Sequence, residues 1–106
     1  MGRILILEPE AELRELFAHV ARRLGHETVT DAGSEPVDVV LVEPENARTF
    51  AAARDMHERF PEVPVICASI RSASYSVRRE LEPRRCLLKP FAVTELERAL
   101  TDALRA

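Results

Sequence analysis

Hydrophobic residues in this chain follow two patterns that alternate from one end to the other. Four short runs are almost wholly apolar, as in parallel strands buried on both faces of a sheet. They cover residues 4–7, 37–42, 63–68 and 86–88, and a weaker strand is predicted at 27–30. Between the runs, apolar residues recur every three or four positions, as in helices that bury one face. These helical stretches are residues 13–24, 50–60, 75–81 and 93–104.

Strands that alternate with helices indicate βαβ units, a parallel sheet and helices on both of its faces. We therefore expect an α/β fold with a doubly wound sheet of five parallel strands. No linker, low-complexity tract or long repeat interrupts the pattern. Residues 1–106 are accordingly predicted to form a single domain.

The segment 31–36 breaks this alternation. It contains Gly33 and Pro36 and is too short for the helix that normally joins two parallel strands. An extended chain covers roughly 3.3 Å per residue, so the segment spans about 20 Å, enough to return beside the sheet. We expect the second helix to be missing or reduced. The sheet face near the first two strands should then be thinly covered, with apolar surface left for association.

Composition narrows the possible functions. The chain has 15 Lys and Arg residues against 18 acidic ones, and its net charge of −3 argues against direct nucleic-acid binding. No apolar run is long enough to cross a bilayer, and the first residues do not resemble a signal peptide, so we expect no membrane contact and a cytoplasmic location. The three histidines and two cysteines lack the spacing of a metal site.

Residues at four predicted strand ends resemble those of response-regulator receiver domains. Glu8 follows the first strand, where receivers carry an acidic pair, and Glu43 ends the third, where they carry the phosphorylated aspartate. Ser69 ends the fourth strand, where receivers have a signalling Ser or Thr. Lys89 and Pro90 belong to Leu-Leu-Lys-Pro-Phe, which matches the family's Lys-Pro-Phe motif. The resemblance runs through the whole chain in order.

The resemblance implies a flavodoxin-like sheet in the strand order 2-1-3-4-5 and a cis bond before Pro90. Sites in such folds lie at the carboxyl ends of the strands. Glu8, Glu43, Ser69 and Lys89 are therefore expected to form one pocket, with Glu43 within ion-pair reach of Lys89 and Ser69 nearby.

Several positions depart from the family's pattern. Glu43 replaces the phosphoacceptor aspartate, Pro9 replaces an acidic magnesium ligand, and Cys86 replaces the aromatic switch residue. The loop after Glu43 is also shorter than usual. Glu43 carries its carboxylate one methylene farther than aspartate, and a misplacement of about 1 Å can cost about a hundredfold in rate. We therefore expect no cofactor and no enzymatic activity. Glu8 and Glu43 are the remaining candidate side-chain ligands for Mg²⁺.

Three interpretations of Glu43 remain open. Its carboxylate can imitate a phosphorylated aspartate by reaching toward Ser69 and Lys89, or it can be a relic of the acceptor site. The third interpretation is local. Glu8-Pro9-Glu10 and Glu43-Pro44-Glu45 are the same tripeptide after a buried strand. Proline suits the first position of a helix, and glutamate favours the positive end of the helix dipole.

These features predict an atypical receiver-like signalling module that acts through protein–protein interaction, independently of phosphorylation. Its expected partner is a histidine kinase, an output domain or another signalling protein, and a homodimer is also possible. One alternative is a working phosphorelay receiver that accepts phosphate from a histidine kinase. Another is a flavodoxin-like domain that binds a small molecule, although the chain has only three glycines and no Gly-rich phosphate loop.

Overall fold

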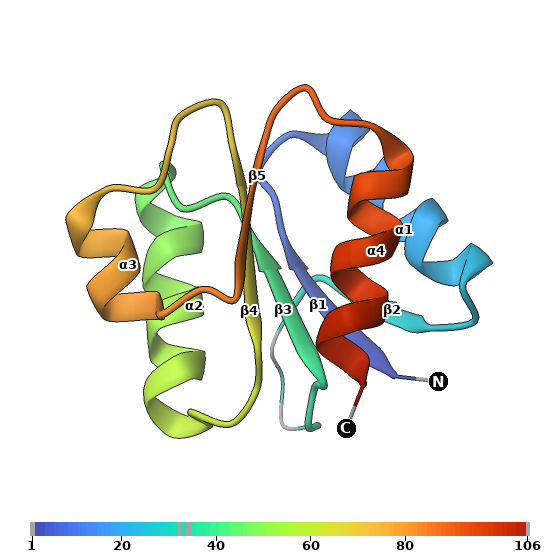
Figure 1. The fold of residues 1–106 in the computed structure, drawn as a ribbon. Helices are drawn as coiled ribbons and strands as arrows, with labels where there is room; N and C mark the ends of the chain where they lie inside the picture. Colours follow the sequence, from blue (N-terminus) through green and yellow to red (C-terminus); the bar gives the residue numbers. More distant parts are fainter. Residues whose placement is uncertain (1, 32, 34, 106) are drawn as a thin grey trace.

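In the computed structural model, strands and helices follow one another along most of the chain (Figure 1). The structure describes residues 2–31, 33 and 35–105. Within these ranges the elements are β1 (Arg3–Leu7), α1 (Ala11–Arg23), β2 (Glu27–Val29), β3 (Val39–Val42), α2 (Ala47–Arg59), β4 (Val65–Ser69), α3 (Tyr75–Leu81), β5 (Arg85–Leu88) and α4 (Val93–Leu104). None of the helices described there is both long and apolar enough to span a bilayer.

All five strands are parallel and lie in the order β2-β1-β3-β4-β5. Helices α1 and α4 cover one face of the sheet, and α2 and α3 cover the other (Figure 1). The predicted doubly wound fold and its strand order are therefore confirmed. The order reverses between β1 and β3, and the loops that leave these strands diverge to opposite faces. In such folds this point forms a crevice at the carboxyl ends of the strands.

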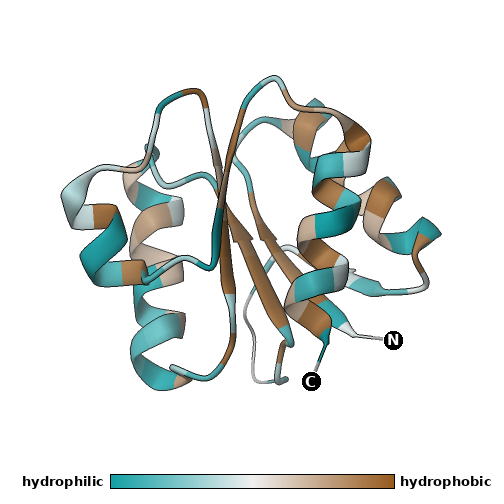
Figure 2. Ribbon diagram, in the orientation of Figure 1, coloured by the Kyte–Doolittle hydropathy of each residue, from teal (hydrophilic) through white to brown (hydrophobic). Residues whose placement is uncertain are grey.

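Alternate residues of the central strands face opposite helical layers. Ile4 and Ile6 pack with α1 and α4, whereas Leu5 and Leu7 pack with α2 and α3. All four residues of β3 are buried. Burial on both faces explains why these strands read as continuous apolar runs, and Figure 2 shows them in brown between helices with hydrophilic outer faces.

The connection from β2 to β3 crosses the sheet without a helix in its described part, as predicted. Ala32 and Ser34, within the predicted segment, lie outside the described residues. Polar contacts of Arg3 tether the crossover: its guanidinium lies 2.6 Å from a carboxylate oxygen of Glu35 and 2.9 Å from one of Glu27. The α2 side of β2 is therefore only partly covered, with Val29 half-buried, whereas α2 and α3 cover β1 on that side. The predicted exposed apolar surface was wrong for the described residues, because none of the large exposed apolar side chains belongs to β1 or β2.

One helix and one strand begin at residues other than those predicted. The helix predicted at 50–60 begins at Ala47, because the Asn46 side chain accepts a hydrogen bond from the Thr49 N–H at 3.0 Å and caps the helix three residues earlier. The strand predicted from residue 37 begins at Val39. There the Asp38 side chain accepts the Arg3 N–H at 2.7 Å in place of a backbone partner.

Three apolar side chains of the predicted helical stretches, which the periodicity placed on the buried faces, are instead exposed: Leu16 by 44%, Phe60 by 39% and Val93 by 40%. The buried face of α1 is formed by its neighbours Phe17 and Val20. Leu16 lies at the edge of an apolar groove beside Ile70. Helical periodicity located the helices correctly but made their buried stripes one residue too wide.

Two leucines on strands test how the sheet is stabilised. Leu41 is 1% exposed at the centre of β3, and Leu88 is 51% exposed at the end of β5. Leu41→Ala should lower the free energy of unfolding by about 2–5 kcal/mol, because it opens a cavity in a packed core. Leu88→Ala, the matched control, should change it by less than about 1 kcal/mol. Urea denaturation measures both, and equal losses would contradict the described core.

Candidate functional site

The carboxyl ends of β1, β3 and β5 bring three charged side chains together. Nζ of Lys89 lies 2.8 Å from Oε1 of Glu8 and 2.9 Å from Oε1 of Glu43. The two glutamates are neighbours because β1 and β3 are adjacent, with Leu7 paired to Val42. Lys89 follows β5, so its side chain reaches back past the end of β4. Glu8, Glu43 and Lys89 are called the ion triad below.

The second carboxylate oxygen of each glutamate is held by its own tripeptide. Oε2 of Glu8 accepts the Glu10 N–H at 3.1 Å, and Oε2 of Glu43 accepts the Glu45 N–H at 3.0 Å. The intervening proline restricts the backbone to a φ near about −65° and so favours this turn. Both carboxylates are therefore fixed by two hydrogen bonds, one within the turn and one to Lys89.

The repeated tripeptide does not start the helices as the local interpretation proposed. The N-caps are Glu10 for α1 and Asn46 for α2, so Pro9 and Pro44 lie before the cap and not at the first helical position. That interpretation was wrong because the carboxylate of Glu8 or Glu43 closes a turn of its own before the helix begins.

Sequence analysis missed two residues that support the triad. The carbonyl oxygen of Glu8 accepts a hydrogen bond from Nη1 of Arg14 at 2.9 Å, and that of Glu43 accepts one from the Thr49 hydroxyl. Each donor comes six residues after its glutamate. The spacing of six residues is the same in both cases. It could not be recognised in the sequence, because one donor is an arginine and the other a threonine.

The triad is largely removed from water. The exposed side-chain fractions are 12% for Lys89, 4% for Glu8 and 10% for Glu43. Burial lowers the pKa of Lys89, but the hydrogen bonds and charges of Glu8 and Glu43 outweigh it, so that this pKa is raised above its usual value. The ammonium is therefore charged at neutral pH and holds the two carboxylates together.

The structure places Ser69 and Pro90 beside the triad without joining them to it. Ser69 is buried, and its hydroxyl accepts the Arg71 N–H at 3.4 Å. Its backbone carbonyl accepts the Lys89 N–H at 2.8 Å, which fixes the end of β5 against β4. The Lys89–Pro90 bond is cis, as the resemblance implied. The Ser69 hydroxyl therefore takes part in a local hydrogen bond at the start of the loop after β4. Among the described residues it forms no hydrogen bond to Glu43.

Cys86 lies within β5, on the sheet face that α2 and α3 cover, and is not part of the triad. It pairs in register with Cys67 of β4, and both pack on the side of α2 and α3. Burial, followed by the neighbouring Cys86 thiol, raises the pKa of Cys67 to about 12. A thiol with so high a pKa is a poor nucleophile, as expected of a packing residue.

The residues of the triad do not fit a magnesium ion. Mg²⁺ requires carboxylate and water oxygens in an octahedron at about 2.0–2.1 Å. The four carboxylate oxygens of Glu8 and Glu43 already accept hydrogen bonds, and the Lys89 ammonium lies between the two side chains. Pro9 adds no oxygen ligand from its side chain. Across the described residues, no three His, Cys, Asp or Glu side chains are grouped as metal ligands.

Several solved structures similar to this chain are receiver domains or response regulators. The receiver domain of the Pseudomonas aeruginosa sensor histidine kinase PA1611 is 22% identical, with 97% of each chain covered and a TM-score of 0.77. That structure contains a magnesium ion coordinated in the active site cleft. A CheY-like receiver domain from Methanospirillum hungatei is 16% identical, with 98% of this chain and 94% of that chain covered and a TM-score of 0.83.

NtrX from Brucella abortus is 25% identical over 97% of this chain, with a TM-score of 0.79. This chain spans only 27% of the NtrX chain. No family model matches the sequence, and no curated protein does. The comparisons establish that the chain has the receiver-domain fold.

Removal of the ammonium tests the energetics of the triad. Lys89→Met should lower the free energy of unfolding by about 3–5 kcal/mol at neutral pH, because two buried carboxylates lose their counter-charge. Adding Glu8→Gln and Glu43→Gln to Lys89→Met should recover much of that loss, since each glutamine oxygen can still accept the hydrogen bond of its turn. Urea denaturation gives both values. A loss below about 1 kcal/mol in Lys89→Met would show that the buried contact adds little.

The titration of Lys89 can be followed directly, because it is the only lysine in the chain. Its pKa is raised, so the stability it contributes is complete below the unfolded value of about 10.4 and is lost as pH rises through the higher folded value. The pH dependence of the ¹³Cε chemical shift of this single lysine should show a midpoint above that of free lysine. Glu43→Gln should lower the midpoint. A midpoint at or below the free-lysine value would refute the triad.

Proposed function

We propose that this chain is a degenerate receiver-like signalling module that acts through protein–protein contacts and does not depend on aspartyl phosphorylation. The ion triad carries the proposal. Phosphoryl transfer to a carboxylate needs a free nucleophilic oxygen, a cation to neutralise charge and an in-line approach. In this chain the lysine that matches the receiver motif is held by two carboxylates instead of being free for a phosphoryl group.

The position of Glu43 supports partial imitation of a phosphorylated aspartate. Its Oε1 receives the Lys89 ammonium, which is one of the two contacts expected of a mimic. The other expected contact, with the Ser69 hydroxyl, is not found among the described residues, where that hydroxyl accepts a hydrogen bond from the Arg71 N–H. We therefore propose that Glu43 fixes the end of β5 through Lys89 and does not bind the Ser69 hydroxyl, which stands at the position of the receivers' signalling Ser or Thr.

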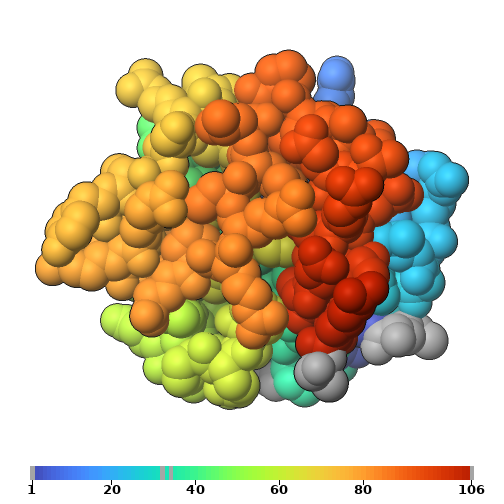
Figure 3. Space-filling model, viewed as in Figure 1, coloured from blue at the N-terminus to red at the C-terminus, as the bar shows by residue number. Residues whose placement is uncertain are grey.

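A face suited to a protein partner lies over α3, β5 and α4, which Figure 3 shows side by side. Three large apolar side chains are exposed on these elements: Tyr75 by 78%, Leu88 by 51% and Val93 by 40%. The Arg79 guanidinium lies 5.7 Å from the centre of the Tyr75 ring. Aromatic and arginine side chains are the residues that most often anchor protein interfaces.

The proposed partner is a histidine kinase, an output domain, another signalling protein or a second copy of the chain. In this proposal the module works in the cytoplasm as a single domain and catalyses no reaction. Cys86 occupies the switch position as a small, half-buried residue, so the reorientation of an aromatic side chain is not part of the readout.

A working phosphorelay receiver is the alternative, and the magnesium ion in the similar Pseudomonas structure makes such a cofactor plausible. To accept phosphate, this chain would have to break the contact between Lys89 and Glu43 and expose a carboxylate oxygen. It would also have to bind magnesium with Glu8 and Glu43 alone. Both steps work against a buried, hydrogen-bonded ion group.

A phosphorylation assay separates the two functions. When the full chain is incubated with magnesium and acetyl phosphate, its intact mass should show no stable phosphoryl adduct. The reason is that Glu43 is misplaced and paired and that Pro9 supplies no metal ligand. A base-labile adduct that maps to Glu43 and disappears in Glu43→Gln would overturn the proposal.

The double variant Glu43→Asp with Pro9→Asp is the positive control, because it restores the two acidic groups that receivers carry at these positions. Labelling of the variant but not of the parent would identify a disabled receiver site. If neither is labelled, the shortened loop after Glu43 closes the site, and the chain retains only the receiver fold.

A further inference from the structure

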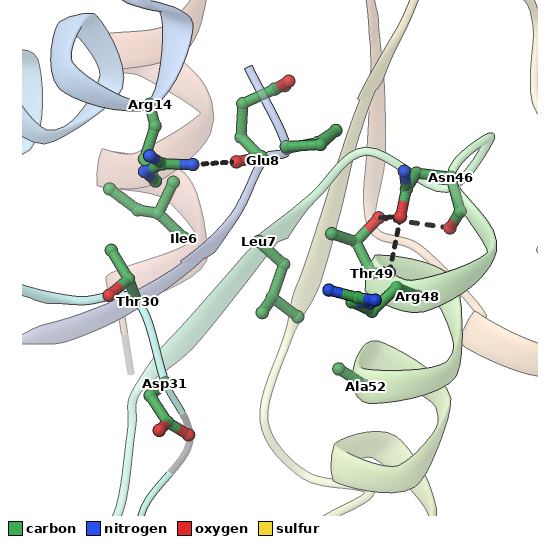
Figure 4. A pocket seen from close by; sticks show the side chains of 11 residues that line it. Ile6, Leu7, Glu8, Arg14, Thr30, Asp31, Asn46, Arg48, Thr49 and Ala52 are labelled. Carbon is green, nitrogen blue, oxygen red and sulfur yellow. Dashed lines mark hydrogen bonds between the residues drawn. The ribbon is translucent and has the colours of Figure 1, made fainter. Parts of the chain in front are cut away.

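The crossover without a helix leaves a hollow between α1 and α2, at the carboxyl end of β1 (Figure 4). Its volume is about 750 Å³, within the range of about 300–1,000 Å³ that small-molecule sites occupy. Its walls come from three parts of the chain: the end of β1 with the first turn of α1, the crossover after β2, and the start of α2. The lining side chains are Ile6, Leu7, Glu8, Pro9, Arg14, Thr30, Asp31, Asn46, Arg48, Thr49 and Ala52.

Two arginines line opposite walls of this hollow, with Leu7 between them (Figure 4). Arg14 projects from α1 and uses one N–H group for the carbonyl oxygen of Glu8. A guanidinium has five N–H donors, so several remain for another acceptor. Arg48 projects from α2 and is exposed, and no carboxylate of the described residues lies within ion-pair distance of it.

One of the two acidic side chains of the lining is not available to pair with the arginines. The carboxylate of Glu8 is committed to Lys89 and to the Glu10 N–H. Asp31, on the crossover, is the other acidic residue of the lining. Asp31 is thus the one acidic side chain of the lining that is not bound to Lys89, and the two guanidiniums give the hollow more hydrogen-bond donors than this carboxylate can accept. Leu7, only 8% exposed, contributes an apolar surface below them.

We propose that this hollow binds a small organic anion, with a carboxylate or phosphate group between Arg14 and Arg48 and an apolar part over Leu7. Arginine favours such groups because its planar donors match two oxygens at once. Thr30 and Asp31 stand where they can accept hydrogen bonds from hydroxyl or amino groups of the ligand. The ligand would contact α1, the crossover and α2 and would thus link these three segments.

This site is separate from the proposed interaction function, because no triad side-chain charge is used in binding. Its effect would nevertheless reach the triad. Arg14 contacts both the hollow and the backbone of Glu8, so a ligand that orders Arg14 also fixes one arm of the ion group. The proposal therefore adds control by a small molecule to a module in which phosphate control is proposed to be lost.

Phenyl phosphate, benzoate and adenosine monophosphate serve as probes. Each is titrated into the ¹⁵N-labelled full chain at constant ionic strength, and amide chemical shifts are followed by NMR. At least one probe should give saturable shifts confined to the amides of the hollow, including those of Thr30, Asp31 and Arg48. Arg48→Gln should weaken that binding about tenfold, as the loss of a charge-assisted hydrogen bond predicts. Arg14→Gln should weaken it as well.

Arg98→Gln is the matched control, because Arg98 is an exposed arginine on α4, remote from the lining. Its affinity for the probe should equal that of the parent. Saturable shifts elsewhere, equal affinity in Arg48→Gln and the parent, or no saturable shift with any of the three probes would overturn the proposal. None of these results depends on whether Glu43 accepts phosphate.

Discussion

The contact that organises this protein's candidate site is the bridge from one ammonium to two buried carboxylates. Two glutamates at the ends of adjacent parallel strands repel each other unless a cation lies between them. Lys89 supplies that cation and, at 12% side-chain exposure, loses much of its own hydration in doing so. The bridge therefore joins β1, β3 and β5 at one edge of the sheet and makes the position of each strand end depend on the other two.

The same bridge is the basis for proposing that the site does not accept phosphate. Every oxygen of the two carboxylates already accepts a hydrogen bond, from Lys89 or from the backbone of its own turn. Such a group is well suited to hold a fixed conformation. It is poorly suited to bind a metal ion or to attack a phosphoryl group, because either event requires breaking contacts inside a low-dielectric environment.

The crossover between β2 and β3 has no helix among its described residues and borders a neighbouring part of the molecule. It is held by Arg3 and forms one wall of the hollow between α1 and α2. Arg14 links the two features, since it lines the hollow and supports the turn at Glu8. The hollow therefore lies beside the ion triad.

The sequence by itself determined the strands, the helices, their order and a crossover after β2 with no helix among its described residues. It could do so because burial on one face or on two produces a characteristic spacing of apolar residues. It also pointed to Glu8, Glu43 and Lys89 as strand-end residues. Only the tertiary structure decided which oxygen meets which donor. Hydrogen bonds such as that between Ser69 and Arg71 depend on side-chain direction, and Arg14 and Arg48 face one hollow only because separate helices are packed against one sheet. Neither the direction of a side chain nor a contact between residues distant in sequence changes the spacing of apolar residues, so neither could be predicted.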